Sequence, residues 1–89
     1  MRKIKLSGRE LSVLRAIDFA TGSTGAELET RTRLEPEELS DIVNAFLDAG
    51  FVETNPPSEK ITVEQLAGVK VEINPGYSHD LSDAIRRRY

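Results

Sequence analysis

The sequence predicts an α+β fold in which a core of three helices is followed by a β-hairpin and a short C-terminal helix. Two observations support this prediction: apolar residues recur at helical spacing before Gly50, and they alternate as in strands after it. The length of 89 residues and the hydrophobic fraction of 38% suit one globular domain. We therefore expect a single domain over residues 1–89, with its core at about 7–74 and its last helix at about 79–88.

The first helix is expected from about Gly8 to about Ala20. Ser7 and Glu10 have the spacing of a capping box, in which each side chain accepts a hydrogen bond from the backbone N–H of the other residue. Gly22 suits the left-handed conformation that often follows the end of a helix. One face of this segment is apolar and should be buried: Val13, Leu14, Ile17 and Ala20.

A second, shorter helix is expected from Ser23 or Thr24 to about Arg31. Thr24 and Glu27 repeat the capping-box spacing, whereas Gly25 in the first turn weakens the helix. Because few of its residues are apolar, we expect this segment to be stable as a helix only when it packs against its neighbours.

The strongest helical pattern covers residues 36–49. Pro36 suits the first helical position, and Gly50 suits the end of the helix. The apolar residues form one complete core-facing stripe: Leu39, Ile42, Val43, Phe46 and Leu47. The opposite face is then expected to be exposed, with Glu37, Ser40, Asp41, Asn44, Ala45 and Asp48 on it.

Residues 51–54 and 69–73 alternate between apolar and polar side chains and are expected to pair as the two strands of a hairpin. A turn at 55–58 follows the first strand. The rest of the long connection leaves two alternatives open. Residues 61–67 fit a further strand, because their side chains begin by alternating, and they equally fit a single helical turn closed by Gly68.

The order of helix, short helix, amphipathic helix and hairpin is that of a winged helix-turn-helix. Three stretches, at 25–28, 34–39 and 46–53, resemble the helix-turn-helix and first wing strand of MarR-like and related prokaryotic winged-helix domains. The most specific piece is the junction Leu47-Asp48-Ala49-Gly50-Phe51-Val52, and the resemblance covers roughly residues 7–74. It implies sequence-specific DNA binding by the helix at 36–49 and phosphate contacts by a basic wing.

The charges of the chain depart from both implications. From Leu34 through Glu59 there are seven acidic residues and no Lys or Arg, and the net charge of the chain is −3. A helix that presents carboxylates to phosphates is repelled, whereas DNA-binding helices gain from counterion release. Helices read guanine with Arg or Lys and adenine with Asn or Gln, and of these types the expected exposed face carries only Asn44. The hairpin is also net acidic, with Lys60 and Lys70 against Glu53, Glu59, Glu64 and Glu72.

We therefore expect a non-catalytic interaction module in a regulatory setting, whose partner is another protein or a second copy of the chain. The expected partner-binding residues lie on the acidic face of the helix at 36–49: Glu37, Asp41, Asn44 and Asp48. The simpler interpretation of these residues is a solvated face whose first-turn acids stabilise the helix.

The alternative function is that of a DNA-binding transcriptional regulator that uses the basic ends of the chain instead of the acidic helix. If both ends lie on the same side of the molecule, their cations form a patch: Arg2, Lys3, Lys5, Arg9, Arg86, Arg87 and Arg88. The simpler interpretation is that these are solvated ends, with the arginines interacting favourably with the C-terminal dipole of the last helix.

The sequence offers little for catalysis. The chain has no cysteine, which excludes disulfides, thiolate nucleophiles and cysteine zinc sites. His79 is the only histidine, and its sequence neighbours Ser78 and Asp80 do not make a triad by adjacency. No run of roughly 18 apolar residues is present. We expect neither catalysis nor a cofactor, a metal, a small-molecule substrate or a membrane partner, and we expect a cytoplasmic location.

Overall fold

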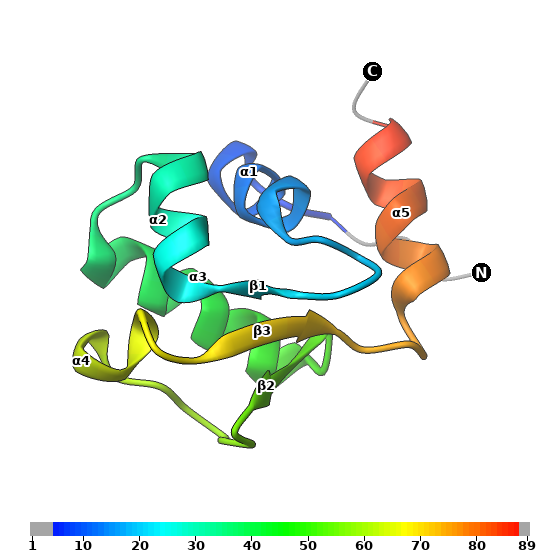
Figure 1. The fold of residues 1–89 in the computed structure, drawn as a ribbon. Helices are drawn as coiled ribbons and strands as arrows, with labels where there is room; N and C mark the ends of the chain where they lie inside the picture. Colours follow the sequence, from blue (N-terminus) through cyan, green and yellow to red (C-terminus); the bar gives the residue numbers. More distant parts are fainter. Residues whose placement is uncertain (1–4, 88–89) are drawn as a thin grey trace.

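The computed structural model describes residues 5–87 and has the α+β architecture that the sequence predicts. Helices and strands follow one another as α1 (Gly8–Ala16), β1 (Ser23–Thr24), α2 (Gly25–Thr32), α3 (Pro36–Ala49), β2 (Val52–Asn55), α4 (Val63–Leu66), β3 (Lys70–Ile73) and α5 (Ser78–Arg87). Figure 1 shows α4 and α5 at opposite ends of the molecule, with the sheet between them.

The sheet has three antiparallel strands in the order β1-β3-β2. The hairpin of β2 and β3 has the expected pairing, with Val52 opposite Ile73. The sequence prediction missed β1, because a strand of two residues is too short to show an alternating pattern. Since β3 lies in the middle, β2 is an edge strand.

The core lies where α1, α2 and α3 pack together and against the sheet. The largest buried side chains come from these three helices and from the connection between β2 and β3: Phe46, Leu14, Leu28, Leu39, Ile61 and Leu66. The helix α5 adds Leu81 to this core and packs beside α1, as Figure 1 shows. The expected apolar stripe of α3 is therefore the side of the helix that faces the core.

The first helix ends four residues earlier than predicted, at Ala16 instead of about Ala20. Beyond it, the Asp18 carboxylate accepts hydrogen bonds from the backbone N–H groups of Ala20 at 2.8 Å and Thr21 at 3.1 Å. The Ser23 hydroxyl accepts from the N–H of Asp18 at 3.0 Å. These bonds give the backbone an alternative to another helical turn, and the chain reverses so that β1 can pair with β3.

The start of α2 has the capping box that the sequence predicts, between Thr24 and Glu27. Gly25, however, has a packing role that the sequence did not reveal. A Cβ atom at this position would lie 1.8 Å from the carbonyl oxygen of Leu66. The glycine therefore allows the backbones of α2 and α4 to meet, which compensates for its poor helix propensity.

The structure selects the helical alternative for the connection between β2 and β3. Residues 63–66 form the single turn α4, which begins with a capping box between Thr62 and Gln65. Leu66 from this turn is only 1% exposed and contributes to the core. Alternation at Ile61 to Glu64 therefore did not indicate a strand.

Candidate functional site

The outward side of α3 carries carboxylates. Glu37, Asp41 and Asp48 are all exposed, as the helical spacing predicts. No lysine or arginine lies within α3 to offset them. This side of α3, defined by these three residues, is called the acidic α3 face below.

Two other residues expected on the exposed side are not there. Ser40 is buried, and its hydroxyl donates a hydrogen bond to the Glu37 carbonyl oxygen at 2.9 Å. Asn44 is half-buried and makes two bonds to Ile61: its Nδ2 donates to the carbonyl oxygen at 2.9 Å, and its Oδ1 accepts from the N–H at 2.8 Å. The prediction that Asn44 belongs to an exposed face was wrong, because its amide is occupied within the molecule.

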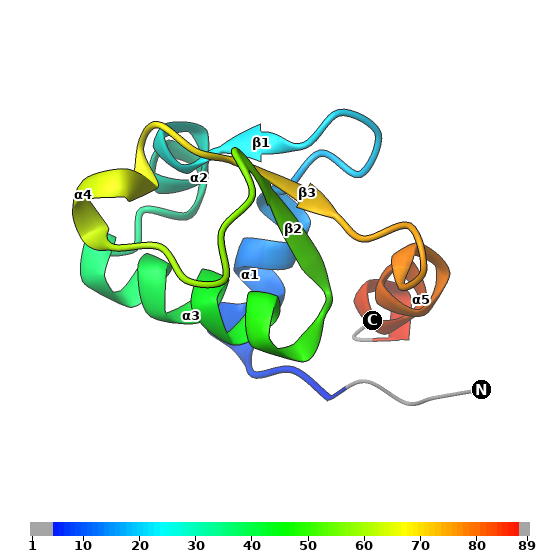
Figure 2. The same ribbon diagram turned by 90° about the horizontal axis from the view of Figure 1, so that it is seen from below.

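The Asn44–Ile61 pair holds the chain that follows β2 against α3. Ile61 is itself 1% exposed, and α4 then packs on α3. Figure 2 shows the chain returning beside α3 before it enters α4. The connection between the strands therefore lies on the helix instead of projecting from it.

The structure describes only part of the proposed basic patch. Lys5 and Arg86 are exposed, and residues 5–7 run beside α5 in both ribbon views. Arg9 is exposed as well, but its guanidinium forms an ion pair with Glu38 of α3. Arg2, Lys3, Arg88 and the side chain of Arg87 lie outside the described part of the chain. A role for these cations in binding nucleic acid stays a prediction.

Arg31 has an internal role that the sequence analysis missed. Its Nη1 atom donates to the Ala16 carbonyl oxygen at 2.7 Å and to the Ser23 hydroxyl at 2.9 Å. It thereby satisfies a free carbonyl at the end of α1 and links α1, β1 and α2. No pattern in the sequence could have revealed this, since the bonded groups are 8 and 15 residues away.

Two carboxylates near these elements are stabilised in their charged form. The backbone N–H of Thr21, followed by that of Ala20, holds the pKa of Asp18 below its ordinary value of 3.8. The backbone N–H of Thr24 likewise lowers the pKa of Glu27 below 4.5. Both side chains shape a loop or a helix start, so the lowered pKa values reflect structure and do not mark a reactive site.

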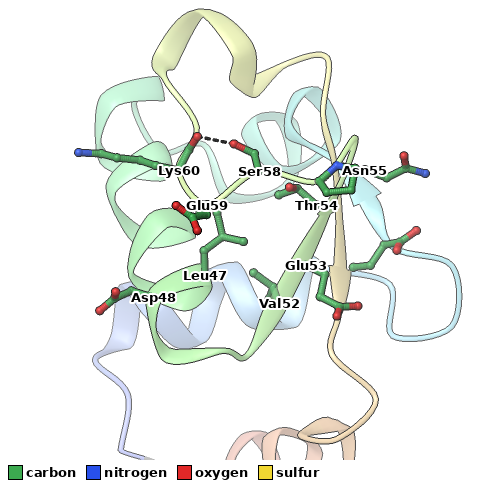
Figure 3. Close-up of a pocket in the computed structure, with 11 residues that line it drawn as sticks. Leu47, Asp48, Val52, Glu53, Thr54, Asn55, Ser58, Glu59 and Lys60 are labelled. Atoms are coloured by element: carbon green, nitrogen blue, oxygen red, sulfur yellow. Dashed lines mark hydrogen bonds between the residues drawn. The ribbon is translucent and has the colours of Figure 1, made fainter.

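A groove of about 980 Å³ lies between the end of α3, the strand β2 and the loop at 57–60. The sequence analysis did not find it, because it depends on the path of the loop. Figure 3 shows residues from all three elements around it, and the Ser58 hydroxyl donates to the Lys60 carbonyl oxygen at 2.6 Å within the loop. Four carboxylates and one ammonium group line the groove, from Asp48, Glu53, Glu59, Glu72 and Lys60.

Residues 5–87 contain no group of three or more His, Cys, Asp or Glu side chains that could hold a metal ion. In the same part of the chain no helix has the length and apolarity needed to cross a bilayer. His79 is exposed near the start of α5.

The helix order, the three-stranded sheet and the long strand connection define a winged helix-turn-helix. Comparison with solved structures supports this: the multiple antibiotic-resistance repressor MarR from Listeria monocytogenes has the same fold, with a TM-score of 0.70 and 16% sequence identity. The match covers 92% of this chain and 52% of that chain, so this chain spans about half the length of the repressor. No protein-family model and no curated protein matches the sequence. The chain thus has a MarR-like winged-helix fold.

Proposed function

We propose that this chain is a non-catalytic winged-helix module of a regulatory system that binds proteins and does not read DNA with α3. The observation that carries this proposal is the acidic α3 face, with the side chains of Glu37, Asp41 and Asp48 exposed on it. The partner would carry lysine or arginine where it meets this face, because complementary charge favours encounter and orientation.

The physical argument concerns phosphate charge. A helix in the major groove lies between two rows of phosphates, and each cation that meets them adds binding free energy by releasing counterions. Carboxylates at the same positions are repelled instead. An asparagine side chain can read the edge of an adenine, but the Asn44 amide already makes two hydrogen bonds to the backbone of Ile61. The carboxylates and the internal hydrogen bonds of Asn44 both disfavour DNA recognition by α3.

The second candidate is a DNA-binding transcriptional regulator that uses the basic ends of the chain. Two observations favour it: the fold likeness to a repressor, and the exposure of Lys5 and Arg86 with the N-terminal segment beside α5. Fold alone is weak support, because one fold serves many functions.

Binding to random duplex DNA, measured by fluorescence anisotropy over roughly 50 to 200 mM salt, separates the two candidates. We expect no saturable binding for the wild-type chain. Micromolar binding that weakens steeply with salt would overturn the protein-binding proposal. In that event the Arg86→Glu variant should lose the binding, whereas Asp41→Asn on α3 should keep it, if the basic ends are the contact.

A further inference from the structure

The groove beside β2 has the features of a binding site for a cationic side chain. We infer that it receives the arginine-rich end of α5 from a second copy of this chain. This inference rests on the proposed function, because it takes the chain to be a protein-binding module, and it goes further by naming the partner and a second surface. The following observations support it.

The groove runs along the edge of the sheet. Because the strand order is β1-β3-β2, one side of β2 has no neighbouring strand, and the groove extends around this edge. Val52 and Thr54 line it from the buried face of β2, and Glu53 lines it from the exposed face. Part of its lining is apolar, from Leu47, Val52 and Pro57. Such a surface suits the aliphatic stem of an arginine or lysine, while its charged head reaches the rim.

The rim is strongly negative. Glu53 and Glu72 lie directly opposite each other on β2 and β3, and both line the groove together with Asp48 and Glu59. Like charges in directly opposite positions of an antiparallel pair destabilise a sheet. Lys60 is the only cation of the lining. A guanidinium placed near Glu53 and Glu72 would relieve their repulsion.

A second, independent feature is an unsatisfied hydroxyl in the same lining. Thr54 is 6% exposed, and among the described residues its Oγ1 is the only buried side-chain nitrogen or oxygen without a hydrogen-bond partner. Figure 3 shows Thr54 on the side of β2 that faces the groove. Leaving a buried polar group unpaired is costly, and such groups are rare in folded proteins. An arginine N–H would supply the missing donor.

The chain itself carries the complementary group. Arg86 and Arg87 end α5, Arg88 follows them in the sequence, and Arg86 is exposed. Figure 1 shows the end of α5 on the opposite side of the molecule from β2 and from the loop that follows it. Because the described end of α5 does not reach the groove of its own copy, we place the contact between two copies.

Such a contact joins two different surfaces, so it is heterologous. After one contact, one copy keeps a free groove and the other keeps a free α5 end, so association can continue into a ring or an open chain. The average mass should therefore rise with protein concentration. Because the contact depends on exposed charges, it should weaken as salt rises.

Sedimentation velocity over a range of protein concentrations at low salt tests this inference. We expect the wild-type chain to associate, and two charge-reversed variants to remain monomeric: a groove variant, Glu53→Lys with Glu59→Lys, and an arginine variant, Arg86→Glu with Arg87→Glu. An equimolar mixture of the two variants should associate again, because each then offers the charge that the other needs. Circular dichroism of each variant checks that it is folded.

Two further variants test whether the association depends on this groove. Glu35→Lys with Glu64→Lys reverses the same number of exposed charges outside both the groove and the acidic α3 face, and it should leave self-association within about threefold of wild type. Thr54→Val keeps the shape but removes the hydroxyl, and it should weaken association about tenfold, as expected for a lost hydrogen bond to a charged group.

Three results would each overturn the inference: a wild-type mass that does not change with concentration, association that survives in the groove variant, or a mixture that stays monomeric. Different results would contradict this inference and the proposed function. Saturable, salt-sensitive binding to duplex DNA would defeat the proposed function, whereas a monomeric chain that also ignores DNA would defeat only the second-copy contact.

Discussion

Gly25 lies where the backbones of α2 and α4 meet. Its missing side chain leaves room for the Leu66 carbonyl oxygen, which would be 1.8 Å from a Cβ atom. The N–H of Gly25 also donates to the Val69 carbonyl oxygen at 3.0 Å, which ties the start of α2 to the segment before β3. Sequence alone shows a glycine in the first turn of a helix, and only the tertiary structure shows why it is there.

Replacing Gly25 with alanine should therefore destabilise the fold, although alanine is the better helix former. Forcing a methyl group against a backbone carbonyl costs about 1–3 kcal/mol or more. Gly8→Ala is the matched control, because Gly8 also begins a helix and nothing lies within 4 Å of its would-be Cβ. Urea unfolding of both variants measures the difference. Equal stability of the two would show that α4 is not packed on Gly25.

Asp18 marks the point at which the sequence prediction for α1 failed. Its bonds to the N–H groups of Ala20 and Thr21 favour a turn at a place where apolar periodicity favoured another helical turn. Periodicity reports the face that is buried, but it does not show whether a nearby carboxylate will bond the backbone.

The Asp18 carboxylate should make the stability depend on pH. Because its pKa is lower in the folded chain than its ordinary value of 3.8, the charged form stabilises the fold above that pH. This contribution is lost as pH falls through the lowered value. Urea unfolding of wild type and Asp18→Asn from about pH 6 to about pH 2 should show a difference that shrinks on acidification. A difference that stays constant over this range would contradict the proposed cause.

Among the elements, α3 was predicted almost completely and the hairpin connection was not. Pro36, the apolar stripe and Gly50 all act within one helix, so local sequence contains the whole signal. Gly50 has a φ of +84°, and the N–H of Phe51 donates to the Phe46 carbonyl oxygen at 2.9 Å, as expected at such an end. The connection instead depends on a contact between residues 17 positions apart.

The same reason explains which parts of the candidate site could be predicted. Glu37, Asp41 and Asp48 follow from helical spacing, and the structure finds them exposed. Asn44 has the same spacing, but a polar residue at the edge of a helix can face either solvent or another segment of the chain. The groove could not be predicted at all, since its walls come from α3, β2 and a loop.

The contact between α3 and the loop should depend on the Asn44 amide. Asn44→Ala removes both hydrogen bonds and leaves the N–H and carbonyl oxygen of Ile61 without that partner, which should cost about 1–3 kcal/mol. Amide hydrogen exchange should show Ile61 losing protection first. Asn55→Ala on β2 is the control, because Asn55 is exposed and should have little effect. Unchanged exchange at Ile61 would mean that other contacts hold the loop.

For the whole molecule, the fold and the charges lead to different expectations about what the chain binds. The winged-helix fold presents one helix of a helix-turn-helix to a partner, and the sequence gives that helix carboxylates while it places arginines and lysines near the ends of the chain. A fold fixes which surface is presented, and the side chains on it determine what can bind. We propose that the acidic α3 face disfavours DNA binding by this helix, and the acidic groove extends the same charge to the edge of the sheet.

The proposal that the carboxylates of α3 disfavour DNA binding is tested most directly by reversing the charge of the acidic α3 face. Binding to random duplex DNA is then measured as a function of salt concentration. Glu37→Lys with Asp41→Lys should bind with an affinity that falls as salt rises, while wild type shows no binding. The control is Asp80→Lys with Asp83→Lys on α5, which has the same net charge but lies at the other end of the molecule and should bind more weakly. If wild type already binds DNA, or if the α3 variant gains no more than the α5 control, the carboxylates of α3 are not what keeps this module from DNA.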